Sequence, residues 1–257
     1  MLSIIPIPAF KDNYIWLLIN NKNQQAIIVD PGDATPVIRE LETRGLTLCA
    51  ILITHHHDDH CGGLDKLTRL FSIPVYGPEV ENIIHVNQPV RGGDKVTVPL
   101  CDISFTVLDI PGHTKGHIAY YSPGMVFCGD TLFTAGCGRL FEGTAEQMLQ
   151  SLSKLCQYPE DTLIYCGHEY TLANLQFAQA VEPTNKDIQA RLQATNDLRI
   201  QGLPSVPALL ALEKRTNPFL RCHVKEVIEA AEKQAGNLLN TPVSVFSTLR
   251  IWKNGFK

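Results

Sequence analysis

A dense run of metal-ligand residue types constrains this chain more than any other feature. The run is Thr54-His55-His56-His57-Asp58-Asp59-His60, and it follows the apolar residues 50–53, which are predicted to form a buried strand. At a strand end, His55 and His57 point to the same side because successive side chains alternate between faces. Asp59 and His60 lie in the following turn, within reach of a neighbouring position. This spacing predicts a metal site rather than a solvated histidine-rich loop.

Three further segments at predicted strand ends carry the same residue types. They are Pro111-Gly112-His113-Thr114-Lys115-Gly116-His117, Cys128-Gly129-Asp130-Thr131 and Cys166-Gly167-His168-Glu169-Tyr170. In each segment a glycine lies beside the candidate ligand, where it lets the backbone turn sharply near a crowded centre. A single His or Asp after a strand is more often a capping or turn residue. Together, however, the segments indicate one composite metal site.

The hydrophobic pattern predicts a mixed α/β region followed by a helical one. Predicted strands cover residues 3–8, 14–19, 26–30, 49–54, 103–110, 117–121, 125–128 and 162–166, enough for two sheets, and predicted helices cover residues 34–44, 63–71 and 144–156. Thr144 is the expected N-cap of the last of these helices. Helical periodicity then dominates over residues 172–180, 186–200, 206–215, 224–234 and 242–253. We therefore predict two domains, residues 1–170 and 171–257.

Charge and composition exclude several classes of partner. A net charge of -4 gives no basic surface for nucleic acid. The longest apolar runs are strand-sized, well short of the roughly 20 residues that a membrane span needs, and the start MLSIIPIPAF shows no signal peptide. Eight scattered cysteines without a CxxC pair fit a reducing cytosol better than a disulfide framework. We expect a cytoplasmic protein that acts on a small molecule, with no membrane or nucleic-acid partner.

The motifs resemble those of the metallo-β-lactamase superfamily. The resemblance rests on the HxHxDH run, the later GHTxGH, GDT and GHE segments, and Val29-Asp30-Pro31-Gly32 upstream, and it covers about the first 170 residues in order. It implies an α/β fold, a four-layer αββα sandwich, here with a C-terminal helical domain. It also implies one metal held by His55, His57 and His113 and a second held by Asp59, His60 and His168. Asp130 would bridge the two metals.

Further segments resemble glyoxalase II, the hydroxyacylglutathione hydrolase family, and extend the resemblance over nearly the whole chain. They are residues 136–144, 167–171, 217–221 and the predicted helix 242–253. The resemblance implies glutathione contacts at Arg139, Tyr170, Arg250 and Lys253, and cations suit the two glutathione carboxylates. Some family members have a tyrosine at the position of Phe141, so one hydroxyl contact to the peptide is absent here. The alternative reading of Arg250 and Lys253 is a solvated helix face.

The resemblance implies hydrolysis of glutathione thioesters, S-D-lactoylglutathione to D-lactate and glutathione, and with it methylglyoxal detoxification. Asp59 and Asp130 are the expected catalytic carboxylates, and a hydroxide that bridges the metals is the expected nucleophile. Two divalent ions are expected; zinc is favoured, and His/Asp sites also accept iron or manganese. Because thiolate is a good leaving group, no dedicated protein acid is required. We expect a monomer.

Two rival functions use the same motifs. A persulfide dioxygenase would hold a single iron in a similar ligand set, but that family lacks the long helical extension. A non-enzymatic binding module predicts eroded ligands, whereas all seven are present.

The remaining candidate ligands are assigned to lesser roles. His56 alternates away from its neighbours and is expected to support the site or face solvent. Asp30 and His117 either brace a ligand through a hydrogen bond or are turn residues. His85 and His223 carry no motif, and Cys61 is expected to serve packing.

Overall fold

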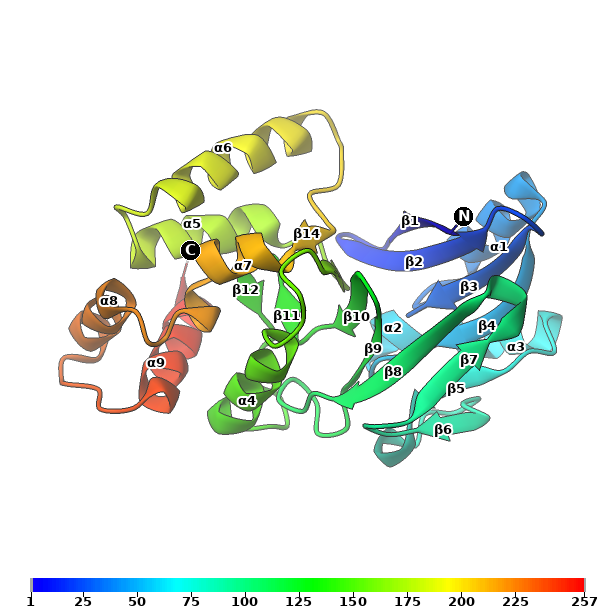
Figure 1. The fold of residues 1–257 in the computed structure, drawn as a ribbon, viewed down its shortest axis with the longest axis horizontal. Coiled ribbons are helices and arrows are strands. Elements are labelled where there is room, and N and C mark those ends of the chain that lie inside the picture. The colour runs from blue at the N-terminus through cyan, green and yellow to red at the C-terminus, as the bar shows by residue number, and fades with distance from the viewer. Residues whose placement is uncertain (1, 257) are drawn as a thin grey trace. The chain divides into compact units, whose positions relative to one another are not determined.

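The structure is a computed structural model that describes residues 2–256, and the chain packs into two compact units (Figure 1). The first unit runs to Asp109 and resumes over Thr114–Gly129, coloured blue to green in the figure. The second contains Ile110–His113 and the chain from Asp130 onward. The predicted division into residues 1–170 and residues 171–257 stays a prediction.

A six-stranded mixed sheet forms the centre of the first unit, in the order β1-β2-β3-β4-β5-β6. The strands are β1 (Leu2–Ala9), β2 (Asn13–Asn20), β3 (Gln25–Val29), β4 (Thr47–Leu52), β5 (Val75–Pro78) and β6 (Gln88–Val90). The pairs β1–β2 and β2–β3 are antiparallel, whereas β3 to β6 pair in parallel. All residues of β2 are buried, as a strand covered on both faces requires.

Three helices follow strands of this sheet. They are α1 (Ala34–Arg44), α2 (Asp58–Cys61) and α3 (Leu64–Leu70). Helix α1 begins at Asp33, whose side chain accepts a hydrogen bond from the backbone N–H of Thr35, and it ends at the left-handed Gly45. Helices α1 and α3 contribute Val37 and Leu67 to the hydrophobic core of this unit. The core thus fixes both ends of the segment that carries the histidine run.

Four antiparallel strands complete the first unit, in the order β10-β9-β8-β7. They are β7 (Lys95–Val98), β8 (Ile103–Asp109), β9 (Ile118–Ser122) and β10 (Met125–Gly129), with the short 3₁₀ helices η1 (Glu79–Glu81) and η2 (Pro99–Cys101) elsewhere in the unit. The Tyr120 hydroxyl donates to the carbonyl of Ile53, and the backbone N–H of Ile118 donates to the carbonyl of Thr54. Strand β9 therefore holds the end of the segment that follows β4.

Helices dominate the second unit. They are α4 (Ala145–Leu155), α5 (Thr171–Val181), α6 (Lys186–Ile200), α7 (Leu210–Thr216), η3 (Pro218–Leu220), α8 (Lys225–Ala235) and α9 (Pro242–Gly255). The strands are β11 (Leu132–Phe133), β12 (Gly136–Cys137), β13 (Leu163–Cys166) and β14 (Ala208–Leu209), which form the antiparallel pairs β11–β12 and β13–β14. Leu175 and Ala178 of α5 pack with Ile188 of α6 around Ala135. This packing ties the β11–β12 turn to the helices.

Two local predictions have clear outcomes. Thr144 caps α4 through a complete capping box with Gln147, which confirms the predicted helix start. The helix predicted from Val206 instead begins at Leu210. Pro207 has no N–H to donate, and the two residues after it form β14, which pairs with β13. The early part of this segment is therefore a strand and not a helix.

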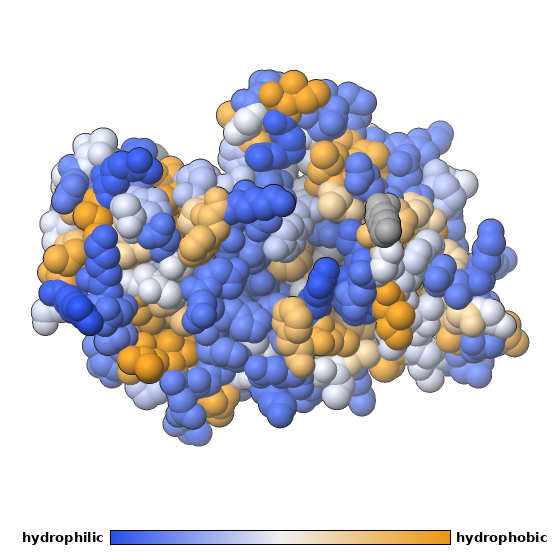
Figure 2. Space-filling model, turned by 180° about the vertical axis from the view of Figure 1, so that it is seen from behind, coloured by the Kyte–Doolittle hydropathy of each residue, from blue (hydrophilic) through white to orange (hydrophobic). Residues whose placement is uncertain are grey.

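The surface is mixed in character. On the face drawn in Figure 2, separate apolar areas are divided by hydrophilic side chains. No helix within residues 2–256 is long and apolar enough to cross a membrane.

Candidate metal centre

Asp30 anchors the chain at the end of β4. Its two carboxylate oxygens accept hydrogen bonds from the backbone N–H and the hydroxyl of Thr54, at 2.8 and 2.7 Å. Both residues are buried. Asp30 itself has a positive φ of 53°, an uncommon backbone conformation outside glycine. The two hydrogen bonds from Thr54 to this buried carboxylate fix where the histidine run begins.

The structure brings His55 and His57 together. His55 Nε2 and His57 Nδ1 lie 3.1 Å apart, and the rings meet edge to face with centroids 4.7 Å apart. His55 is fully buried, and its Nδ1 lies 3.0 Å from the Thr54 hydroxyl. Two ring nitrogens at this separation suit a shared cation, because neutral imidazoles present lone pairs that a metal can accept.

His60 and Asp59 lie on the same side of the segment. His60 Nδ1 lies 3.0 Å from Asp30 Oδ2, and its Nε2 lies 3.7 Å from Asp59 Oδ2. The ligand atoms of Asp30, His55 and His60 all lie within 4.8 Å of one another. Asp30 thus holds the Nδ1 side of His60 and turns its Nε2 toward Asp59. Such an arrangement fixes the ring orientation and raises ligand basicity.

Asn13 also belongs beside Asp59, although the sequence did not predict it. Its side-chain amide donates to Asp59 Oδ2 at 2.9 Å, and the residue is buried at the start of β2. Because Asp59 is 42% exposed at its side chain, this hydrogen bond limits its rotamers. No local motif marks Asn13, since it lies 46 residues before Asp59.

His117 and His56 take different places beside the cluster. The His117 ring stacks on His55, with centroids 4.5 Å apart and an interplanar angle of 18°. Its Nδ1 lies 3.0 Å from the carbonyl of Ile118. His56 lies with its Nδ1 3.1 Å from Glu81 Oε2, and its side chain is 36% exposed. His117 therefore packs against a candidate ligand, whereas His56 contacts a different element, η1.

The second unit brings together the other three candidate ligands, Asp130, His113 and His168. Asp130 Oδ2 lies 3.5 Å from His113 Nε2 and 3.3 Å from His168 Nε2. His113 Nδ1 lies 2.8 Å from the carbonyl of Arg139, which can only accept, so Nδ1 is the donor and Nε2 is the nitrogen that faces Asp130. All three side chains are buried. A carboxylate with two imidazole nitrogens matches the donor set that a divalent cation requires.

Gly138 makes this close packing possible. A Cβ at this position would lie 1.9 Å from the carbonyl oxygen of Asp130 and 3.1 Å from His113 Nδ1. Any other residue would push the chain away from both groups. The glycine belongs to residues 136–144, which resemble the glyoxalase II pattern.

Two candidate substrate residues lie against the ligands of the second unit. Tyr170 stacks on His168 with centroids 4.6 Å apart and an interplanar angle of 5°, and Phe141 meets His113 edge to face at 5.2 Å. Phe141 is 62% exposed, so it offers an apolar surface beside His113. Arg139 is also exposed.

Arg250 and Lys253 lie on α9 and are not a solvated face. Arg250 is 6% exposed, and its Nη1 donates to the carbonyl of Cys137 at 2.6 Å. Lys253 Nζ donates to the carbonyl of Ala173 at 2.8 Å. Burial, followed by the charges of Arg250 and Arg139, lowers the pKa of the Lys253 ammonium to about 8. The helix thus concentrates positive charge, which favours an anionic partner there.

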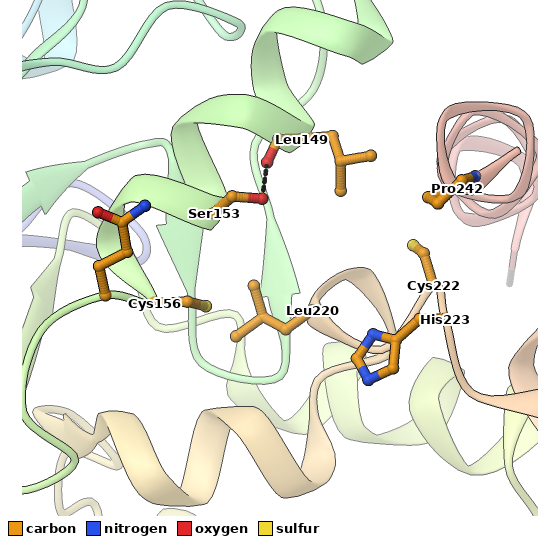
Figure 3. A pocket seen from close by; sticks show the side chains of 8 residues that line it. Leu149, Ser153, Cys156, Leu220, Cys222, His223 and Pro242 are labelled. Carbon is orange, nitrogen blue, oxygen red and sulfur yellow. Dashed lines mark hydrogen bonds between the residues drawn. The ribbon is translucent and has the colours of Figure 1, made fainter.

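A separate pocket of about 350 Å³ in the second unit lies away from these residues. It is lined by side chains of α4, η3 and the start of α9 together with Cys222 and His223 (Figure 3). The Ser153 hydroxyl donates to the carbonyl of Leu149 in its own helix. Burial raises the pKa of the Cys156 thiol to about 11 and that of Cys222 to about 12. Neither thiol is therefore a ready nucleophile at neutral pH.

Comparison with known proteins gives the family. Residues 11–168 match the family model "Metallo-beta-lactamase superfamily", and residues 169–256 match "Hydroxyacylglutathione hydrolase C-terminus". The chain is 52% identical to the hydroxyacylglutathione hydrolase of Nitrosomonas eutropha over 258 aligned residues, covering 100% of both chains. The chain belongs to the hydroxyacylglutathione hydrolase family. Membership makes it a hydrolase of the metallo-β-lactamase superfamily, and the helical C-terminal match disfavours the dioxygenase alternative.

Solved structures agree with the fold of this family. ETHE1 from Myxococcus xanthus is 27% identical, with 98% of each chain covered and a TM-score of 0.66. TTHA1623 in a di-iron-bound form is 26% identical, with 84% of this chain and 100% of that chain covered and a TM-score of 0.61. These similarities confirm the predicted α/β fold of the metallo-β-lactamase type. In the hydroxyacylglutathione hydrolase family, the His/Asp groups described above imply divalent metals.

Proposed function

We propose that the protein hydrolyses glutathione thioesters, cleaving S-D-lactoylglutathione to D-lactate and glutathione. The observation that carries the proposal is the identity of 52% to a named hydroxyacylglutathione hydrolase over the full length of both chains. The buried His/Asp clusters in each unit supply the residue types that such chemistry requires. In a cell, this reaction would complete the removal of methylglyoxal as its glutathione adduct.

We propose that seven residues hold two divalent metals. One metal is assigned to His55, His57 and His113, the second to Asp59, His60 and His168, and Asp130 is assigned to both. Support comes from the 3.1 Å distance between His55 Nε2 and His57 Nδ1. It also comes from the Nε2 atoms of His113 and His168, which lie within 3.5 Å of Asp130 Oδ2. Zinc is the proposed metal because His-rich sites with carboxylates suit it, although iron and manganese fit the same donors.

The chain's own residues orient this chemistry. When bound, the metals would supply Lewis acidity and lower the pKa of a water molecule to near neutrality. Asp30 holds His60 through Nδ1, and the Arg139 carbonyl holds His113 in the same way. Asn13 fixes Asp59, which together with Asp130 forms the proposed catalytic carboxylate pair. The departing glutathione thiolate needs no proton from the protein at neutral pH.

The proposed glutathione contacts lie in the second unit. Arg139, Tyr170, Arg250 and Lys253 would bind the peptide, and Phe141 would offer an apolar surface in place of a hydroxyl. Support comes from the positive charge of α9: burial first, and then the charges of Arg250 and Arg139, lower the pKa of the Lys253 ammonium. An incoming carboxylate would relieve the repulsion among these charges.

We also propose that residues 1–170 act as the catalytic domain and residues 171–257 as the substrate-binding domain, in a cytoplasmic monomer. Support comes from the two family models, which meet between residues 168 and 169, two residues before the proposed boundary. Eight free cysteines fit a reducing compartment.

The test compares two thioesters with the same acyl group. One is S-D-lactoylglutathione, and the other carries the acyl group on a simple thiol that lacks both glutathione carboxylates. We expect kcat/KM to be higher for the glutathione thioester by about ten-fold or more, because two carboxylate contacts are lost. Equal values for the two substrates would contradict the assignment to glutathione thioesters.

A further inference from the structure

Glu81 is a buried carboxylate with a position that no motif explains. It ends the short helix η1, and its side chain is only 4% exposed. A carboxylate is rarely buried to this extent unless it is paired or hydrogen-bonded. The partners of its two carboxylate oxygens therefore indicate its role.

One oxygen of Glu81 binds the loop that leads into β9. Glu81 Oε1 accepts hydrogen bonds from the hydroxyl of Thr114 and, at 3.0 Å, from the backbone N–H of Gly116. A Cβ at residue 116 would lie 2.5 Å from both Glu81 Cγ and Val80 Cγ2. Gly116 is thus required for this approach, and the two donors fix the backbone of the loop on the carboxylate.

The other oxygen faces the histidine run. Glu81 Oε2 lies 3.1 Å from His56 Nδ1, and it has no aligned hydrogen-bond donor among the described residues. A single side chain therefore lies between the segment after β4 and the loop before β9. These segments are 25 residues upstream and about 33 residues downstream of Glu81 in the chain.

The loop that Glu81 holds ends at a ring that supports a candidate ligand. His117 follows Gly116 directly, and its ring stacks on His55 at 4.5 Å. Displacement of residues 114–116 would move His117, and His55 would lose the surface on which it rests. His117 and Thr54 together confine the His55 ring, because the Thr54 hydroxyl lies 3.0 Å from its Nδ1.

We propose that Glu81 is a positioning residue that orients His55 by holding the 114–116 loop, and with it the His117 ring, at a fixed place. It acts through these neighbours and does not itself touch substrate. This inference rests on the proposed metal-dependent function, but its structural part does not, because the hydrogen bonds of Glu81 exist within the protein alone. Groups that orient metal-binding histidines typically change metal affinity by about 10- to 100-fold when removed.

The first test uses metal-free protein and hydrogen exchange. Glu81→Ala should speed exchange of the Gly116 amide by about ten-fold or more, because the amide loses its acceptor. Glu81→Gln retains an acceptor oxygen and should preserve the protection. Glu79→Ala, on the same 3₁₀ helix but 53% exposed, is the matched control and should match wild type. Unchanged Gly116 exchange in a folded Glu81→Ala protein would overturn the proposal.

The second test measures metal affinity by competition with a chelator, and the kinetic constants of the metal-loaded enzyme. Glu81→Ala should weaken metal binding by about ten-fold and lower kcat with little change in KM, with rescue by Glu81→Gln. If Glu81→Ala does not fold, Thr114→Val removes one of the two donors and should weaken metal binding in the same direction. Wild-type metal affinity in either variant would overturn the positioning role. Failure of wild type to hydrolyse thioesters would refute only the proposed function, because Gly116 exchange is measured without metal or substrate.

Discussion

Arg250 and Lys253 should respond differently to replacement by alanine, although they lie one turn apart on α9. Arg250 is 6% exposed, donates to the carbonyl of Cys137 at 2.6 Å, and lies over the ring of Phe219 at 5.1 Å. Lys253 is only partly buried and donates to the carbonyl of Ala173. Both are proposed to attract the glutathione carboxylates, but Arg250 is the more deeply buried of the two.

The magnitudes follow from these contacts. Arg250→Ala leaves the buried Cys137 carbonyl without its charged donor, which costs about 1–3 kcal/mol. Loss of the contact with Phe219 adds about 0.5–1 kcal/mol. A loss of about 1.5–4 kcal/mol in the free energy of unfolding is therefore expected, or roughly 3–16 °C in Tm for a chain of this size. Lys253→Ala should cost about 1 kcal/mol of substrate binding, roughly five-fold in KM. It also removes contacts with the rings of Phe177 and Phe256, so a loss of about 1 kcal/mol in the free energy of unfolding is expected.

The assay combines urea unfolding with steady-state kinetics on S-D-lactoylglutathione. Arg250→Ala should lower the unfolding midpoint and also raise KM, whereas Lys253→Ala should raise KM with a smaller decrease in the unfolding midpoint. Both variants should keep their metals, because the contacts of Arg250 and Lys253 described above involve no candidate metal ligand. The control substrate is a thioester without the glutathione carboxylates, for which Lys253→Ala and wild type should give the same KM.

Two results would refute this reasoning. An unfolding midpoint for Arg250→Ala equal to that of wild type would show that the hydrogen bond to Cys137 carries no net stability. A wild-type KM for Lys253→Ala on the glutathione substrate would remove this ammonium from the proposed binding surface and leave it as a contact within the second unit.

Three further predictions concern the metal ligands and pH. Asp130→Ala should lose metal occupancy and nearly all activity, since it is the one proposed bridge; two retained metals with full activity would remove it from the site. His56→Ala should keep metal content close to wild type by elemental analysis while His57→Ala should not, and the reverse pattern would mean that the ligand assignment is wrong. Because burial and neighbouring cations lower the pKa of Lys253 to about 8, its ammonium loses its proton as pH rises through that value. KM for the glutathione thioester should therefore rise between about pH 7 and 9, and Lys253→Arg, which stays charged, should flatten that rise; an equally steep rise in the variant would assign it to another group.

The candidate ligands could be located from the sequence because their signals are local. Two histidines two residues apart after an apolar run are predicted to point to the same side of a strand end. In the structure, His55 Nε2 and His57 Nδ1 lie 3.1 Å apart. Glycines beside His113, Asp130 and His168 mark sharp turns, and these three side chains come together in the second unit. Strand periodicity and the capping residue Thr144 are local in the same sense.

The supporting residues could not be predicted because their contacts are made by tertiary packing. Asn13 reaches Asp59 across 46 residues, and Glu81 reaches Gly116 across 35. Nothing in the sequence around either residue distinguishes it from a turn or a solvated acid. The burial of Arg250 could not be predicted either. Helical periodicity shows which face of the helix carries Arg250, but it does not show that the guanidinium donates to the carbonyl of Cys137. Sequence order likewise could not show that residues after Pro207 would pair with β13 before the helix starts.

If this chain is a two-metal hydrolase of glutathione thioesters, its activity should depend on how much metal it holds, and a metal titration measures this dependence. Metal is removed from the purified protein and then restored stepwise, with metal per chain and S-D-lactoylglutathione hydrolysis measured on the same samples. Thioester hydrolysis should disappear when the metal is removed and return as metal is restored, and it should reach its plateau at about two ions per chain. Full activity in metal-free protein, or two bound ions without thioester hydrolysis, would contradict the proposed two-metal hydrolysis.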